Sequence, residues 1–243
     1  MTNPTAAMLV IGDEILSGRT RDSNMHFLAR QLTDRGITLG EVRIVSDDHD
    51  RIVGALDDLR ARYDHVFTSG GIGPTHDDIT ADAVAAAFGA MLDIRDDARA
   101  VLAAHYERTG LELNASRLRM ARIPEGAELI ENPVSAAPGF TLGNVHVMAG
   151  VPAVFEAMAV SVLSRIAGGQ ALYSQSLTIQ RGEGEIASDL ATLAKANPDL
   201  SIGCYPFQRD GVFGATVVVR GAEKTQVDAV LVRLGVLFPE AIA

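Results

Sequence analysis

The order of apolar and polar positions over the first two thirds of the chain alternates between strand-like and helix-like patterns. Short apolar runs predict buried strands at 6–12, 39–46, 65–70 and 145–150. The apolar residues that follow at helical spacing are Met25, Leu28 and Leu32; Ile52, Leu56, Leu59 and Tyr63; Ile79, Ala83, Val84, Ala87 and Phe88; and Phe155, Met158, Val162 and Ile166. Because parallel strands need crossover connections, this alternation predicts an α/β fold: a mostly parallel sheet covered by helices on both faces.

Two segments interrupt the alternation. We expect 93–123 to be helical, with Val101, Leu102 and Tyr106 on one face, and 125–141 to form a turn-rich, hairpin-like excursion. The pattern changes after 167–170, which we interpret as a linker. The order strand, helix, strand, strand, helix then predicts a small C-terminal α+β domain, ferredoxin-like or KH-like. We therefore divide the chain into domains at 1–168 and 171–243.

Composition and charge limit the possible functions. The chain has 243 residues, of which 47% are hydrophobic, and no apolar run approaches the ~20 residues needed to span a bilayer. It carries one cysteine, Cys204, and no basic segment followed by an apolar core at its N-terminus, so we expect a cytoplasmic protein. The formal net charge of −10 argues against nucleic acids and membrane surfaces as partners.

Three motifs follow predicted strands, at the edge where open α/β sheets bind ligands. They are GDEILSG (12–18), GGIGPTHDDIT (70–80) and AGVP (149–152). Gly70, Gly71 and Gly73 would let the backbone approach a ligand, and the next helix would direct its N–H groups to the same place. The loop lacks the lysine of a P-loop, and His76 stands where a dinucleotide fingerprint has its last glycine. A different anion-binding site is therefore predicted.

Asp77 and Asp78 change the interpretation of this loop. Two carboxylates beside a phosphate would repel it unless a cation lies between them, and Mg²⁺-type ions bind through one or two carboxylates plus phosphate oxygens. The alternative is that one aspartate caps the following helix, which stabilises by about 1 kcal/mol. Because Asp13 and Glu14 follow a neighbouring strand, we prefer the cation. His76 is either a base or metal ligand, or an ordinary loop residue.

The two longer motifs resemble those of MoaB/Mog-type molybdopterin-binding domains, most closely the N-terminal domain of CinA-like proteins. The family pattern GDEIL.G...D[ST]N is met at 12–24 and GG[IL]GPT.DD.T at 70–80, with shorter matches at 124–132, 137–140 and 150–152. The similarity spans about residues 6–166. GCYPF at 203–207 is also similar to the GSYP of that family's small α+β domain.

This resemblance implies a site for molybdopterin or a nucleotide diphosphate. It implies either a divalent-metal-dependent pyrophosphatase acting on ADP-ribose- or FAD-like substrates, which we favour, or a molybdopterin adenylyltransferase of molybdenum cofactor biosynthesis. A non-catalytic pterin- or nucleotide-binding module is the third alternative. Relatives form dimers or trimers, so a homo-oligomer is expected.

The resemblance also assigns residues to this site. It implies that Asp13, Glu14 and Asp78 are catalytic and that Asp77 and Asp78 hold Mg²⁺, Mn²⁺ or Co²⁺. The ligand-binding residues it implies are Gly12, Asp22, Asn24, Gly70, Gly71, Gly73, Thr75, Asn132, Gly150 and Pro152. For Asp22 the residues themselves leave a helix cap open as an alternative.

Two positions depart from the family pattern. Ser135 and Ala136 stand where relatives often have glycine and threonine, and if that turn needs a positive φ, Ser135 adopts it less readily than glycine. Val154 stands where many relatives have an acidic residue. Ligand contacts at these two places are expected to differ from those of the relatives.

Overall fold

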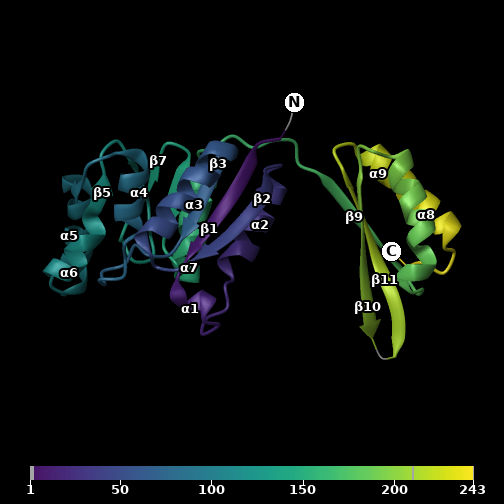
Figure 1. The fold of residues 1–243 in the computed structure, drawn as a ribbon, viewed down its shortest axis with the longest axis horizontal. Coiled ribbons are helices and arrows are strands. Elements are labelled where there is room, and N and C mark those ends of the chain that lie inside the picture. The colour runs from purple at the N-terminus through teal and green to yellow at the C-terminus, as the bar shows by residue number, and fades with distance from the viewer. Residues whose placement is uncertain (1–2, 210, 243) are drawn as a thin grey trace. The chain divides into compact units, whose positions relative to one another are not determined.

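The computed structural model describes residues 3–209 and 211–242, and the chain divides into two compact units between Gly169 and Gln170. The first unit is built on a six-stranded sheet of order β2-β1-β3-β8-β7-β6. Its parallel strands are β1 (Thr5–Ile11), β2 (Thr38–Val45), β3 (His65–Ser69) and β8 (Val145–Met148). The α/β fold predicted from the sequence is confirmed (Figure 1).

Helices cover both faces of this sheet. On one face α2 (Asn24–Asp34) and α7 (Pro152–Leu163) pack against Met8, Val10 and Phe67. On the other, α3 (His49–Arg62), α4 (Thr80–Phe88) and α5 (Asp96–Thr109) belong to the core that contains Leu9 and Ile11. Successive residues of β1 therefore point into opposite cores, as expected for a central strand buried on both faces.

The helical segment expected at 93–123 is wrong at both ends. Its first residues belong to β4 (Leu92–Ile94) and its last to β5 (Arg122–Pro124), and these strands pair antiparallel with Asp93 opposite Ile123. Between them lie α5, the short α6 (Ala115–Leu118) and a 3-10 turn, η1 (Arg119–Ala121). Gly110, with φ of 69°, ends α5 in the left-handed conformation typical of helix C-termini.

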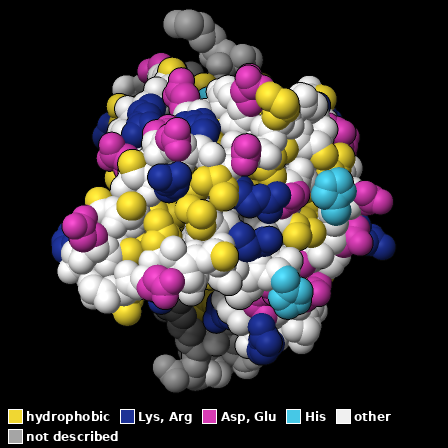
Figure 2. Space-filling view, turned by 90° about the vertical axis from the view of Figure 1, so that its left-hand side faces the viewer, with side chains coloured by type: hydrophobic (Ala, Val, Ile, Leu, Met, Phe, Trp, Pro, Cys, Tyr) yellow, Lys and Arg dark blue, Asp and Glu magenta, His cyan; other side chains and the backbone are white. Residues whose placement is uncertain are grey.

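Two helix positions expected to face the core point elsewhere. Val101 of α5 and Met25 of α2 are exposed, whereas Leu102 and Asn24 beside them are buried. Figure 2 looks at the end of the molecule where α5 and α6 lie, and apolar side chains mix there with arginines and carboxylates. Met91 and Ile94 are further exposed apolar residues of this region.

The excursion at 125–141 is a hairpin that extends the main sheet. Its strands β6 (Glu128–Ile130) and β7 (Gly139–Leu142) pair antiparallel, and β7 pairs antiparallel with β8. The sheet is therefore mixed at this edge. The loop between β6 and β7 returns to the strand ends where the three motifs lie.

The second unit has the predicted order of strands and helices. It contains β9 (Tyr173–Ile179), α8 (Glu183–Ala196), β10 (Ser201–Arg209), β11 (Val212–Gly221) and α9 (Lys224–Leu237). The antiparallel sheet has the order β10-β11-β9, and a single bridge between Thr178 and Ile242 adds a further pairing beside β9. This order is that of a ferredoxin-like unit, with the bridge in place of a fourth strand. Within the described part of the chain, no helix is long and apolar enough to cross a bilayer.

Candidate functional site

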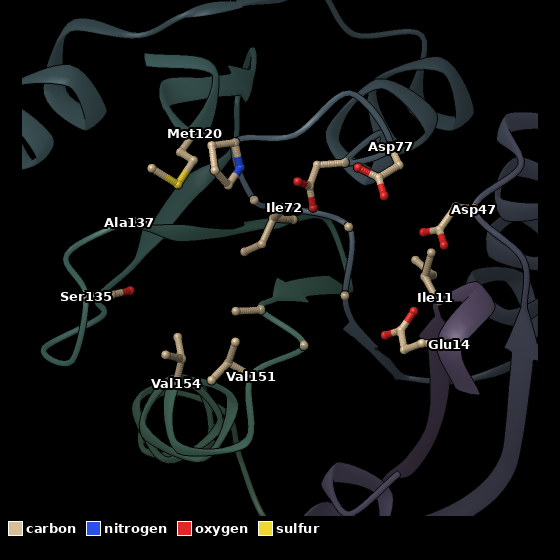
Figure 3. A pocket seen from close by; sticks show the side chains of 18 of the residues that line it. Ile11, Glu14, Asp47, Ile72, Asp77, Met120, Ser135, Ala137, Val151 and Val154 are labelled. Atoms are coloured by element: carbon tan, nitrogen blue, oxygen red, sulfur yellow. The ribbon is translucent and has the colours of Figure 1, made fainter. Parts of the chain in front are cut away.

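The three strand-end motifs meet around a cavity of about 530 Å³. It lies beyond the ends of β1, β3 and β8, where open α/β sheets bind ligands (Figure 3). The residues named from the sequence that line it are Gly12, Glu14, Gly70, Gly71, Gly73, Asp77, Asp78, Asn132 and Gly150. Segments far apart in the sequence therefore share one cavity.

Gly70 and Gly71 form the floor of this cavity and cannot be replaced without movement. Gly70 has φ of 111°, and a β-carbon there would lie 2.1 Å from the carbonyl oxygen of Ile11. At Gly71, where φ is 68°, a β-carbon would lie 2.2 Å from Thr80 Oγ1, the hydroxyl that donates to the Gly70 carbonyl at 3.0 Å. Glycine is thus required because the backbone crosses directly over β1 and the start of α4.

The Asp78 carboxylate is held within its own loop. The backbone N–H and the hydroxyl of Thr75 donate to Asp78 Oδ2, at 2.8 and 2.5 Å. The residue at the N-cap of α4 is Ile79, whose side chain has no capping group. Neither Asp77 nor Asp78 caps α4, so the capping alternative is wrong. Thr75 does not line the cavity but holds the Asp78 carboxylate in place.

Four further residues named from the sequence stand outside the lining. Asp22 Oδ1 accepts from the backbone N–H of Met25 at 2.9 Å, so it stabilises the start of α2. The buried Asn24 donates to Ser69 Oγ and to the Gly150 carbonyl, both at 2.8 Å, and so ties β3 to the loop before α7. Pro152 is the first residue of α7, where its missing N–H costs no hydrogen bond. The fourth is Asp13, whose backbone N–H donates to the carboxylate of Asp47, a residue that the sequence motifs do not include.

That carboxylate belongs to Asp47, which lines the cavity at the end of β2. Asp47 Oδ2 accepts from the N–H of Asp13 at 2.9 Å. Burial raises the pKa of Asp47, and the negative charges of Asp13, Glu14 and Asp77 raise it further, although the hydrogen bond from Asp13 acts in the opposite direction. The sequence feature that could have identified Asp47 is its position two residues after a parallel strand. Asp48 beside it caps α3, so the two aspartates together resemble an ordinary helix-capping sequence.

The cavity has a carboxylate end and an apolar end. Glu14, Asp47 and Asp77 lie on one side of it, and Met120, Ala137, Val151 and Val154 lie toward the other (Figure 3). Among residues 3–209 and 211–242, no three His, Cys, Asp or Glu side chains are close enough to form a complete metal site. Carboxylate oxygens are ligands that Mg²⁺-type ions use, commonly one or two at a site together with oxygens of a substrate and water.

Asn132 organises the loop that borders the apolar end. Its Oδ1 accepts from the N–H groups of Val134 and Ser135, at 3.0 and 3.1 Å, and its Nδ2 donates to Ser135 Oγ and the Ala137 carbonyl, at 2.7 and 2.8 Å. Across the described residues, the non-glycine residue with a positive φ is Ala136, at 62°. The strained position is therefore Ala136 and not Ser135, whose hydroxyl is left at the cavity wall.

Comparison with known proteins gives two family matches. Residues 7–167 match the family described as "Probable molybdopterin binding domain", and residues 171–243 match the middle domain of FAD synthase. The CinA structure from Thermoplasma acidophilum has a TM-score of 0.62 and 36% identity, and covers 67% of this chain and 99% of that one.

Two curated relatives match over most of the chain. A CinA-like protein of Geobacter metallireducens is 35% identical over 81% of this chain and 50% of its own length. A protein named probable FAD synthase from Caenorhabditis elegans is 31% identical over 95% of this chain and 49% of its own length. The chain therefore spans about half of each of these two relatives. Because the first family match covers more than half of the chain, the chain belongs to the MoaB/Mog-type family of molybdopterin-binding domains and resembles its CinA-like members, as the motifs predicted.

Proposed function

We propose that this chain is a divalent-metal-dependent pyrophosphatase that hydrolyses nucleotide diphosphates of the ADP-ribose or FAD type. The observation that carries this proposal is the close approach of carboxylates to a glycine floor within one cavity. The family matches, one named for molybdopterin and one for FAD synthase, support the coarser statement that the site binds a pterin or a nucleotide.

Charge is the reason to include a cation. Glu14, Asp47, Asp77 and Asp78 line the cavity, so a diphosphate bound there without a cation would be repelled. Asp77 and Asp78 are the residues proposed to hold the cation, with Asp78 fixed by Thr75. When bound, a divalent cation polarises the phosphoryl group and lowers the pKa of water. The backbone N–H groups of Gly71 and Gly73 are proposed to donate to the diphosphate oxygens, whereas the Gly70 N–H already donates to the Met148 carbonyl at 3.1 Å and Gly70 shapes the floor.

Asp47 is the proposed base. Its Oδ2 is engaged by the N–H of Asp13, which orients the carboxylate and leaves Oδ1 to take a proton from the attacking water. The water oxygen then bonds to phosphorus while the bond to the bridging oxygen breaks, and the second phosphate leaves with that oxygen. A raised pKa suits a carboxylate that must accept this proton.

The test is an assay of the purified chain on ADP-ribose and FAD with Mg²⁺, Mn²⁺ or Co²⁺, with release of AMP as the readout. We expect turnover with at least one metal; its absence with all three would contradict the proposal. ATP consumption that depends on molybdopterin would instead support an adenylyltransferase. Calorimetric binding without any product would support a non-catalytic module.

A further inference from the structure

The strand β2 forms one outer edge of the main sheet. Within residues 3–209 and 211–242 it pairs with β1 alone, so its other side carries backbone N–H and C=O groups that no strand covers. Because the Val45 carbonyl accepts from the Gly12 N–H at 3.1 Å, Val45 faces β1, and the alternate residues Ile44 and Val42 direct their backbone groups outward. An outer strand of this kind is a template for pairing with another strand.

The length and sequence of β2 set it apart from two other outer strands. It has eight residues and no proline, whereas β6, at the opposite edge of the main sheet, has three residues. In the second unit, β10 has nine residues, but Pro206 near its middle lacks the N–H that pairing would need. The register of β2 shifts at Gly40, close to its beginning. Residues 41–45 therefore form a regular edge without a break.

Apolar side chains on this edge remain exposed to solvent. Val42 and Ile44 pair with Met8 and Val10, whose side chains belong to the core under α2 and α7, yet Val42 is 38% exposed and Ile44 is 43% exposed. Leu16 is also exposed, and it lines with Ile44 a hollow of about 650 Å³ beside the second half of β2. A second strand laid against this edge would therefore remove apolar surface from water as well as satisfy backbone groups.

The face of β2 toward α3 carries charges of both signs. Arg43 Nε donates to Glu41 Oε1 at 2.5 Å, and each residue also pairs with α3, Arg43 with Asp58 and Glu41 with Arg62. Charged side chains on an outer strand commonly prevent it from pairing with another chain. Because Glu41 and Arg43 stand on either side of Val42, their effect depends on which residue lies opposite each of them.

We propose that β2 pairs antiparallel with β2 of a second copy of this chain, about a two-fold axis at Val42. In this register Glu41 of each copy lies opposite Arg43 of the other, which gives two pairs of opposite charge directly across the strands. Ile44 lies opposite Gly40, which has no side chain to obstruct it. An axis at residue 41 or 43 would instead place two glutamates or two arginines opposite one another. The charges therefore select one register, and with it a dimer.

Exchange of the two charges tests both the interface and its register. Sedimentation equilibrium of the full chain should show a dimer. Glu41→Arg places an arginine opposite Arg43, and Arg43→Glu places a glutamate opposite Glu41, so each variant alone should have a dissociation constant at least about tenfold higher than that of the wild type. An equimolar mixture of the two variants should form a heterodimer of about wild-type affinity, because each changed residue then meets the opposite charge.

If thermal unfolding shows that either charge variant does not fold, Val42→Lys replaces the pair. Two lysines would then meet at the axis, and the dissociation constant should rise by a similar factor. Val101→Lys changes a side chain of similar exposure, 44%, on α5, and as the matched control it should keep the wild-type dimer.

Four results would overturn the proposal. These are a monomeric or trimeric wild type, charge variants that dimerise as tightly as the wild type, a mixture no tighter than its components, and an unchanged dimer in Val42→Lys. A monomeric wild type would leave the β2 edge to the second unit of the same chain or to a different protein.

Discussion

Asp47 Oδ2 accepts a hydrogen bond of 2.9 Å from the backbone N–H of Asp13. The bond joins the end of β2 to the first turn after β1, two segments that carry different parts of the site. The GDEIL motif therefore contributes through its backbone as well as its side chains, because its first turn holds the Asp47 carboxylate, which follows β2, at the cavity wall. The carboxylates of Asp13, Glu14 and Asp77 then raise the pKa of Asp47 by their charge, after the larger effect of burial.

Asp47→Asn tests the base. We expect the rate of ADP-ribose hydrolysis to fall about 10²–10⁴-fold, the usual contribution of a positioned base, with affinity for the metal-bound diphosphate largely retained. Steady-state kinetics measure the loss of rate, and calorimetry with α,β-methylene-ADP, a non-hydrolysable diphosphate, measures the retained affinity. Asp96→Asn, which changes a side chain 99% exposed on α5, is the control and should retain wild-type rates. A rate for Asp47→Asn within twofold of the wild type would exclude Asp47 as the base.

Asp78→Asn tests the cation ligand. Asparagine keeps an oxygen to accept from Thr75, so the loop should hold its shape while the charge is lost. We expect the metal concentration for half-maximal rate to rise at least about tenfold, because Mg²⁺-type ions depend on carboxylate charge. A metal titration of activity, with thermal unfolding as the folding check, measures this. An unchanged metal requirement would remove Asp78 from the metal site.

Gly70→Ala tests the floor of the cavity. A β-carbon here meets the Ile11 carbonyl at 2.1 Å, so the variant should lose about 3 kcal/mol of unfolding free energy, or more, and the geometry of the floor. Gly89→Ala is the matched control: its φ of 62° is also left-handed, but no heavy atom lies within 4 Å of the added carbon. It should cost only about 1–2 kcal/mol, the strain of the conformation itself. Urea unfolding gives both values, and equal losses would contradict the role of the clash.

The buried His146 makes stability depend on pH. Burial, assisted by the charge of His65 at 3.2 Å, lowers the pKa of His146 to about 3. Since the unfolded chain binds this proton below about pH 6.5 and the folded chain does not, stability is lost as the pH falls from 6.5 toward 3. At pH 5 the loss amounts to about 2 kcal/mol, from 1.5 pH units at about 1.4 kcal/mol each.

Urea unfolding of the wild type and His146→Asn at pH 7.5 and 5 measures this term. The variant should be less stable at pH 7.5, since it loses the contact with Thr141, but should change less between the two pH values. His76→Asn, which alters a side chain 99% exposed, should follow the wild type. The raised pKa of Asp47 acts in the opposite direction, adding stability as the pH falls, but it is common to both proteins, so the difference between wild type and His146→Asn removes its contribution and reports His146 together with the adjoining His65. Equal pH dependence in both proteins would refute the assignment.

Local patterns explain why much of the fold is predictable from the sequence. Burial on both faces makes β1 an almost continuous apolar run, and the boundaries of α8 are marked by acidic residues in its first turn and Lys195 in its last. Where an element depends on a distant partner, the prediction fails. Asp93 and Ile123 lie in a strand pair whose members are 30 residues apart in the chain, and neither strand has enough residues to show alternation. The prediction that Val101 and Met25 face the core is wrong. Their neighbours Leu102 and Asn24, which fit the same helical spacing of core positions, are buried instead.

The sequence by itself determined the α/β alternation, the glycine floor and the carboxylates that follow β1 and β3, because periodicity and strand-end position are properties of a few adjacent residues. Only the tertiary structure brought Asp47 and Met120 to the same cavity, since these two residues come from segments without a motif and meet through strand order and loop return. It also decided which motif residues line the cavity. Asp22, Asn24 and Thr75 direct their polar atoms to backbone and side-chain partners inside the fold, and a motif does not reveal where a side chain finds its partner.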